Sequence, residues 1–97
     1  MKEYELTILS PQTHTAEAVF NLVDALINQV GGKVTKKEDD GVKRLAYMIN
    51  GQEYALYTFY DLELTKESAV ELSTKLDKTD EVLRYLLVTR DTRKVAR

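Results

Sequence analysis

The chain has 97 residues, a formal net charge of −2 and no cysteine. That length allows one domain, and the lack of cysteine excludes a disulfide scaffold, a thiolate zinc site and a cysteine nucleophile. With 43% hydrophobic and 31% charged residues, the composition is that of a globular domain and not of a disordered segment. No apolar run reaches the roughly 18 residues of a membrane helix, and the first five residues lack the build of a signal peptide. A cytoplasmic protein is therefore expected.

Basic residues gather towards the C-terminal end of the chain. Residues 84–97 carry five basic groups against one acidic group, a local net of +4, which leaves −6 for residues 1–83. Such an asymmetry fits either contact with a polyanion or an ordinary solvated surface. We expect a single domain over residues 1–91 and a short basic tail over residues 92–97.

The first third of the chain reads as a strand followed by a helix. Residues 3–9 alternate so that Tyr4, Leu6 and Ile8 share one face, which predicts a half-buried strand ending at Pro11. Thr15 is a suitable N-cap for a helix that Gly31 and Gly32 would end. Steps of three and four residues separate the members of its apolar stripe, which are Ala16, Val19, Phe20, Val23, Leu26, Ile27 and Val30.

The remaining residues predict three strands and a second helix. Residues 33–49 read as a long strand interrupted near residues 39–41, and Asn50-Gly51 is typical of a type I′ hairpin turn. An aromatic-rich strand over residues 53–64 follows, with Tyr60, Leu62 and Leu64 on one face. Thr65 suits the N-cap of a helix with the stripe Ala69, Leu72 and Leu76, and residues 82–89 form the last strand.

This β-α-β-β-α-β order predicts an α+β, ferredoxin-like fold with two helices on one face of a four-stranded antiparallel sheet. The other face would remain uncovered, and the residues expected there are Leu9, Tyr57, Phe59, Leu86 and Val88. An apolar face of this kind marks a partner site, or else holds scattered surface hydrophobes.

The sequence offers little for catalysis or for small ligands. It has neither G-x-x-x-x-G-K-[ST] nor G-x-G-x-x-G to cradle a phosphate. His14 is the only histidine, and the run Glu38-Asp39-Asp40 is better explained as solvated charge than as a calcium loop. The aromatic strand resembles that of an RNA-recognition motif but lacks its leading basic residue and its glycine. We therefore expect no enzyme activity, metal, cofactor or small-molecule substrate.

Several segments, in order, resemble one protein family along nearly the whole chain. They are Met1-x-x-Tyr4-Glu5, Pro11, Gly32-Lys33-Val34, Gly41-Val-Lys-Arg-Leu-Ala-Tyr-Met-Ile49 and Asp80-Glu-Val-Leu-Arg84. Together they resemble bacterial small-subunit ribosomal protein number six. Two departures stand out, because the family usually has proline where this chain has Met48, and arginine where it has Lys2. Proline blocks strand pairing, so Met48 leaves its edge freer to pair.

The resemblance implies a structural constituent of the small ribosomal subunit. It would bind 16S ribosomal RNA in the central domain (platform) together with small-subunit ribosomal protein number eighteen. Basic residues placed for phosphate contacts are Lys2, Lys43, Arg44, Arg84 and Arg90. Residues placed for the protein partner are Leu45, Ala46, Tyr47 and Met48 on the edge strand, with Tyr57 and Phe59 as further candidates.

Two other classes of function remain open from the residues alone. A small-ligand-binding regulatory domain of the same fold would act as a homodimer, joined through its sheet or edge strands. An acylphosphatase-like enzyme would need a glycine-rich, arginine-bearing loop after the first strand, and residues 10–13 offer neither feature.

Overall fold

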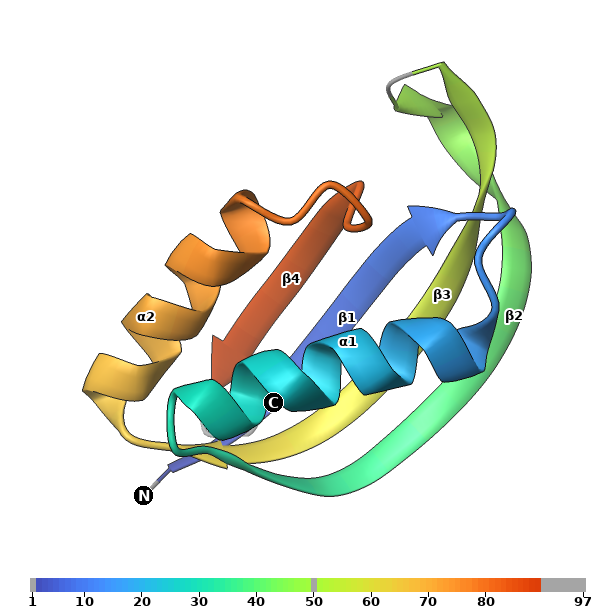
Figure 1. The fold of residues 1–97 in the computed structure, drawn as a ribbon. Coiled ribbons are helices and arrows are strands. Elements are labelled where there is room, and N and C mark those ends of the chain that lie inside the picture. The colour runs from blue at the N-terminus through green and yellow to red at the C-terminus, as the bar shows by residue number, and fades with distance from the viewer. Residues whose placement is uncertain (1, 50, 90–97) are drawn as a thin grey trace, which may run out of the picture.

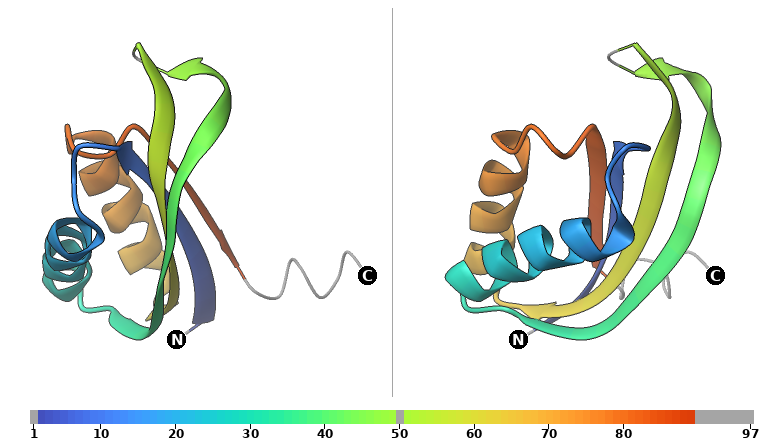
Figure 2. Two further views of the ribbon diagram at one scale, coloured as in Figure 1. Left: turned by 90° about the vertical axis from the view of Figure 1, so that its right-hand side faces the viewer. Right: turned by 45° about the vertical axis from the view of Figure 1, so that its right-hand side comes forward.

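A computed structural model describes residues 2–49 and 51–89. Its elements in chain order are β1 (Lys2–Pro11), α1 (Ala16–Gln29), β2 (Lys33–Ile49), β3 (Gln52–Leu64), α2 (Lys66–Asp77) and β4 (Arg84–Thr89). The sheet has the strand order β2-β3-β1-β4, and every neighbouring pair is antiparallel. Both helices cover the same face, as the turned views show (Figure 1, Figure 2). The predicted ferredoxin-like arrangement is thereby confirmed.

The helices begin where their capping residues predict. The Thr15 side chain accepts a hydrogen bond from the Ala18 amide, and that of Thr65 accepts one from the Ser68 amide, each at 3.1 Å. These bonds satisfy N–H groups that the first helical turn leaves without a partner. Both predicted N-caps are confirmed.

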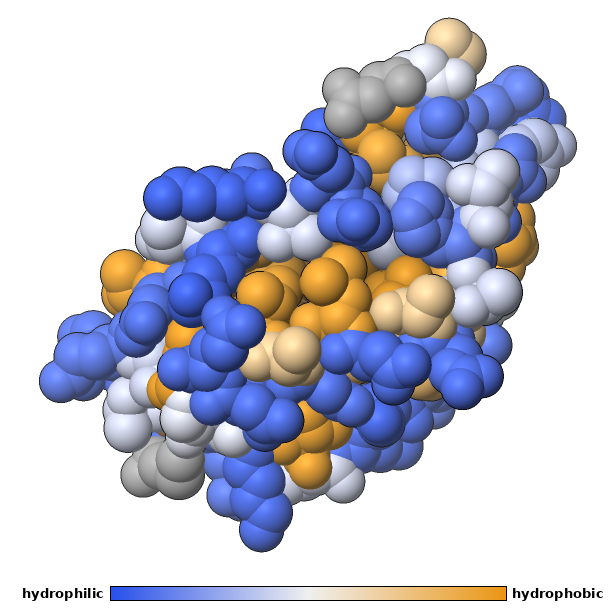
Figure 3. Space-filling model, viewed as in Figure 1, coloured by the Kyte–Doolittle hydropathy of each residue, from blue (hydrophilic) through white to orange (hydrophobic). Residues whose placement is uncertain are grey.

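The inward-facing residues of the strands and the apolar stripes of the helices pack into one core between the sheet and the helices. The helix-bearing surface is mostly hydrophilic, with a band of hydrophobic residues showing between the helices (Figure 3). Beneath it lie the fully or nearly fully buried side chains, which are Tyr4, Leu6, Ile8, Val19, Val23, Ile27, Val30, Leu56, Tyr60, Leu62, Leu64, Ala69, Leu72 and Leu76. Because this set contains the predicted inward residues of β1, β3 and α2, their face assignments are confirmed.

The end of β1 agrees with the prediction, whereas the start of β4 does not. Pro11 is the last residue of β1 and is paired with Ala55 of β3. It is tolerated there because β4 accompanies β1 only as far as Leu9, so one side of the strand carries no ladder. At the other edge, β4 starts at Arg84 and not at residue 82, since the Val82 amide donates to the Thr79 carbonyl in a turn.

Strands β2 and β3 continue past the end of β1 and project from the sheet as a two-stranded hairpin (Figure 1, Figure 2). We call this hairpin the arm and define it as residues 44–49 and 51–54. The interruption predicted near residues 39–41 is present as a shift of register between Asp39 and Gly41. Gly41 has a φ of +79° there, and its amide donates to a carboxylate oxygen of Asp39 at 2.9 Å. A second shift between Arg44 and Ile49 makes the arm irregular.

Candidate functional site

Two of the predicted phosphate-contact residues share one end of the open sheet face. Lys43 pairs with Ala55 near one edge of the sheet, while Arg84 pairs with Leu9 at the other edge. Neighbouring strands lie about 4.8 Å apart, so β2 and β4 are separated by about 14 Å. Tyr57 pairs with Leu9 on the strands between them. The fold thus places Lys43 on one side of the Tyr57 and Leu9 side chains and Arg84 on the other side.

The Lys43 side chain is held by two neighbours. Its ammonium nitrogen lies 2.7 Å from a carboxylate oxygen of Asp40 and 5.3 Å from the centroid of the Tyr57 ring. The hydrogen bond to Asp40 raises the pKa of the Lys43 ammonium, and the charge of Asp40 adds to the effect. Lys43 is therefore positively charged at neutral pH and can attract a phosphate group.

Arg44 stands next to Lys43 in sequence but belongs to the arm. A guanidinium nitrogen lies 3.3 Å from a carboxylate oxygen of Glu53, and the two side chains are 70% and 55% exposed. Exposed pairs of this kind contribute little to stability, about 0–1 kcal/mol. The Arg44 side chain can consequently exchange Glu53 for another anion at small cost.

The other two predicted cations do not join this group in the part of the chain that the structure describes. Lys2 is exposed and pairs with Leu64 at the opposite end of the sheet, where β1 begins. Arg90 lies outside the described residues, as does the tail over residues 92–97. The cationic end of the open face is therefore defined here by Lys43 and Arg84, with Arg44 on the adjoining arm.

The residues predicted to meet a protein partner fall into three groups. Tyr47 and Met48 are 68% and 62% exposed on the arm, and Ala46 is exposed beside them. Leu45 is buried at 8% exposure, so its side chain offers little contact surface in the isolated chain. Tyr57 and Phe59 are half-buried on the open face.

The open face is less apolar than its strand pattern indicates. Leu86 is 60% exposed, whereas Leu9, Tyr57, Phe59 and Val88 are only half-buried. Towards the other end of the face, carboxylates stand opposite one another across β1 and β3 in the pairs Glu3–Glu63 and Glu5–Asp61. Alternation along a strand assigns a residue to a face but does not say which residue lies across from it, so the opposition of these carboxylates is visible only in the structure.

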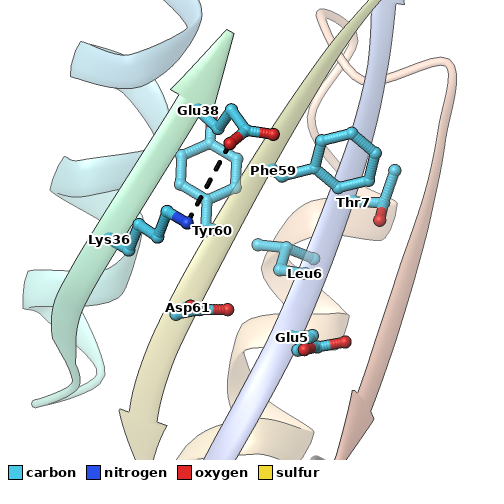
Figure 4. A pocket seen from close by; sticks show the side chains of 8 residues that line it. All are labelled: Glu5, Leu6, Thr7, Lys36, Glu38, Phe59, Tyr60 and Asp61. Carbon is cyan, nitrogen blue, oxygen red and sulfur yellow. Dashed lines mark ion pairs between the residues drawn. The ribbon is translucent and has the colours of Figure 1, made fainter. Parts of the chain in front are cut away.

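A hollow of about 390 Å³ lies on this face between its cationic and acidic parts. Its side chains come from β1, β2 and β3, and the Phe59 ring reaches towards Thr7 while Lys36 points along β2 towards Glu38 (Figure 4). The lining residues are Glu5, Leu6, Thr7, Lys36, Glu38, Phe59, Tyr60 and Asp61. Lys36 and Glu38 form an exposed ion pair at 4.0 Å.

Metal-ligating side chains do not converge anywhere in residues 2–49 and 51–89, where no group of three or more His, Cys, Asp or Glu residues could hold an ion. Within the same residues, neither helix is long and apolar enough to cross a membrane.

Comparison with known proteins assigns the whole described domain to one family. The family model described as ribosomal protein S6 matches residues 3–89. The small ribosomal subunit protein bS6 of Leptothrix cholodnii is 37% identical over 94% of this chain and 77% of its own length. That of Corynebacterium aurimucosum is 31% identical over 96% of this chain and 100% of its own length.

Solved structures agree with this assignment. The crystal structure of 30S ribosomal protein S6 from Thermotoga maritima matches with a TM-score of 0.80 and 26% identity, covering 99% of this chain and 98% of that one. The C-terminal domain of MgtC from Mycobacterium tuberculosis matches with a TM-score of 0.55 and 14% identity over 92% and 87% of the two chains, a likeness of fold alone. The chain belongs to the ribosomal protein S6 family, whose members are proteins of the small ribosomal subunit.

Proposed function

We propose that this chain binds 16S ribosomal RNA in the central domain (platform) of the small subunit, together with small-subunit ribosomal protein number eighteen. Its role there is structural and not catalytic, and it resides with the ribosome in the cytoplasm. The observation that carries the proposal is the placement of Lys43 and Arg84 at the same end of the open face, next to the projecting arm.

Lys43 and Arg84 would contact phosphates of the RNA. Contacts to phosphate fix the position of a protein on RNA without reading its bases. An ammonium group has three N–H donors, and Asp40 needs only one of those of Lys43, so a phosphate can approach without breaking that pair. Arg44 would add a contact from the arm after leaving Glu53.

The arm would meet the protein partner. Ala46, Tyr47 and Met48 are exposed there, and β2 is an edge strand with an irregular pairing at these positions. An edge strand offers backbone donors and acceptors to a second chain, and exposed apolar side chains add area to the contact. Leu45 lies next to them on the same edge strand and, because its side chain is buried, would contribute through its backbone. Tyr57 and Phe59 would extend the contact onto the open face.

The remaining basic positions would contribute from outside this group. Lys2 lies at the far end of the sheet and would touch a different part of the RNA. Arg90 would follow β4 directly, within a domain over residues 1–91, and the tail over residues 92–97 would supply further cations.

The test measures assembly of the chain with its protein partner on a fragment of 16S ribosomal RNA at several salt concentrations. Changing Lys43 and Arg84 together to alanine should weaken binding and lower the slope of log K against log salt by about one to two units. A charge-matched control changes Lys66 and Lys78, which are exposed at the two ends of α2, and should leave the slope unchanged. An unaltered slope in the first variant would remove Lys43 and Arg84 from the RNA contact.

A further inference from the structure

The outer edge of β4 lacks the features that usually protect the edge of a sheet. In the strand order β2-β3-β1-β4, β4 pairs with β1, and no strand within residues 2–49 and 51–89 lies on its other side. Natural edge strands carry charges, proline or bulges, because a bare edge pairs readily with another chain. β4 has none of these between Tyr85 and Val88, where its pairing with β1 runs without a shift of register.

The first part of β2, at the opposite edge of the sheet, carries the usual protection. Eight of the twelve residues 33–44 are charged, and the pairing of β2 with β3 shifts register at three places. In contrast, Arg84 is the only charged residue of β4. The two edges of this sheet therefore differ, and β4 is the edge along which a further strand can pair regularly.

Apolar side chains lie beside β4 on both faces of the sheet. On the open face, Leu86 is 60% exposed. On the helix side, a hollow of about 500 Å³ lies between α2 and β4, and its lining includes Leu76, Val82, Tyr85 and Leu87. A strand added to this edge would thus find apolar neighbours on both of its faces.

α2 also presents an exposed apolar residue on the side that faces β4. The Tyr85 hydroxyl of β4 donates to a carboxylate oxygen of Asp77 at 2.9 Å, which identifies that side of the helix. Val70 lies seven positions before Asp77, two helical turns away and on the same face, and it is 66% exposed. The edge surface therefore consists of β4 together with this face of α2.

We propose that β4 pairs with the β4 strand of a second copy of this chain, in an antiparallel dimer with two-fold symmetry. The axis passes at Leu86, because opposite residues in a sheet must point to the same face. Leu86 then meets Leu86 of the second copy, Tyr85 meets Leu87, and Arg84 meets Val88. The one charged residue of the strand meets no like charge, so the edge is complementary to itself.

The joined surface is small, so the dimer is weak. Six strand residues extend about 20 Å, and one sheet layer with one helix layer is about 20 Å deep, so each copy covers about 400 Å². The total of about 800 Å² lies below the roughly 1,200–2,000 Å² of stable complexes and corresponds to a dissociation constant on the order of 10–100 µM. The dimer is thus a state of the free chain at high concentration.

This dimer leaves the proposed RNA contact uncovered. The two-fold axis is perpendicular to the sheet, so the open faces of both copies point the same way. Lys43 lies on β2 or, counted along the sheet, three strands away from the joined edge. Because the pairing uses the backbone of β4, failure of this proposal would leave the salt dependence of the Lys43 and Arg84 variants unaffected.

The first experiment measures the mass of the full chain by sedimentation velocity, from tenfold below to tenfold above the expected dissociation constant. We expect the average mass to rise from that of one copy, 11.1 kDa, towards that of two. Leu86→Glu places two carboxylates opposite each other at the axis and should weaken association at least tenfold. Val42→Glu is the matched control, since Val42 is 48% exposed on β2, and it should leave association unchanged.

A pair of opposite charges tests the position of the axis. The variants Leu86→Glu and Leu86→Lys should each remain monomeric, whereas an equimolar mixture of the two should associate, because unlike charges then meet at the axis. Circular dichroism checks that both variants fold, as the 60% exposure of Leu86 leads us to expect. A mixture that stays monomeric, or an unmodified chain that stays monomeric at every concentration, would overturn the proposal.

Hydrogen exchange of the unmodified chain locates the contact without any substitution. Half of the β4 amides point away from β1, and their protection should rise with concentration in step with the mass. A rise in mass without this protection would place the dimer contact elsewhere and refute the pairing of β4. Full protection at concentrations where the chain is monomeric would show that another segment of the same chain covers the edge, which equally excludes the second copy.

Discussion

The ammonium nitrogen of Lys37 lies 2.9 Å from a carboxylate oxygen of Asp24, and this ion pair joins β2 to α1. The same nitrogen lies 5.3 Å from the centroid of the Phe20 ring on the helix. The second oxygen of Asp24 is buried and has no hydrogen-bond partner among the described residues. The Asp24 carboxylate therefore depends on Lys37 to offset its partial removal from water.

Changing Lys37 to methionine keeps the aliphatic stem and removes the charge. We expect a loss of about 1 kcal/mol in the free energy of unfolding, because the half-buried Asp24 carboxylate is left without a partner. Urea denaturation measures the effect. Lys36→Met is the matched control, since Lys36 is 66% exposed and only 4.0 Å from Glu38, and it should cost less than about 0.5 kcal/mol. Equal losses in the two variants would contradict the assignment.

Tyr60 makes the stability sensitive to alkaline pH. Burial raises the pKa of its phenol to about 12, the hydrogen bond to Thr58 opposes this shift, and the charge of Asp24 adds to it. Its folded-state pKa exceeds the unfolded value of about 10, so the folded state holds the proton more tightly. The resulting stabilisation is complete below pH 10 and is lost as the pH rises from about 10 to about 12.

Changing Tyr60 to phenylalanine removes the phenol and its hydrogen bond to the Thr58 hydroxyl at 3.2 Å. We expect a cost of about 1 kcal/mol at neutral pH, because the buried Thr58 hydroxyl loses its partner. Between pH values of about 9 and about 11.5 the variant should lose less stability than the parent chain, by about 2 kcal/mol. Urea denaturation at the two pH values measures this difference, and parallel losses would show that Tyr60 does not titrate on unfolding.

The glycines that follow α1 have different roles, which two substitutions distinguish. Gly31 has a φ of +77° with open space around it, so Gly31→Ala should cost about 1 kcal/mol through backbone strain. At Gly32, an added Cβ would collide with the Leu64 side chain and lie 3.0 Å from that of Ile27. Gly32→Ala should therefore cost about 1–3 kcal/mol through overpacking.

Asparagine provides the control, because it tolerates positive φ but is larger than alanine. Thermal or urea denaturation should show that Gly31→Asn recovers most of the loss seen for Gly31→Ala. Gly32→Asn should be at least as damaging as Gly32→Ala. If asparagine rescued position 32, the close approach of α1 to β3 would not be the reason for that glycine.

Met48 lies in the part of β2 where the register skips from the Arg44–Tyr54 pair to the Ile49–Gln52 pair. Its side chain is 62% exposed. Replacing it with proline, the residue that the family resemblance leads us to expect here, should change the free energy of unfolding by less than about 0.5 kcal/mol, because regular pairing is already interrupted there. Met48→Ala controls for the loss of the side chain. A proline variant less stable than the alanine variant by over about 1 kcal/mol would show that the Met48 amide takes part in the ladder.

Most of the fold was predictable because its signals are local. Thr15 and Thr65 mark helix starts through hydrogen bonds to amides three residues away. The inward positions of β1 and of both helices follow from periods of two and 3.6 residues, which any short window of sequence shows. The end of β1 at Pro11 also follows from a local signal, because proline has no amide hydrogen to donate to a ladder.

The candidate site was predictable only as a set of residues. The basic residues were identified from charge, but their grouping depends on which strands lie side by side. Lys2 and Lys43, on the first two strands of the chain, lie at opposite ends of the sheet, whereas Lys43 and Arg84 share one end although 41 positions separate them in the sequence. The burial of the Leu45 side chain could not be predicted either, because the residues that follow it in the sequence are exposed.

The sequence by itself determined the elements, their order and the faces that enter the core, because these depend on contacts between residues a few positions apart. The tertiary structure alone decided the register, and with it the acidic rows opposite Glu63 and Asp61, the hollow at Phe59 and the different roles of Gly31 and Gly32. The physical reason is that strand pairing and close packing join segments distant in sequence. Their spacing is fixed by the fit of the whole core and not by any local pattern.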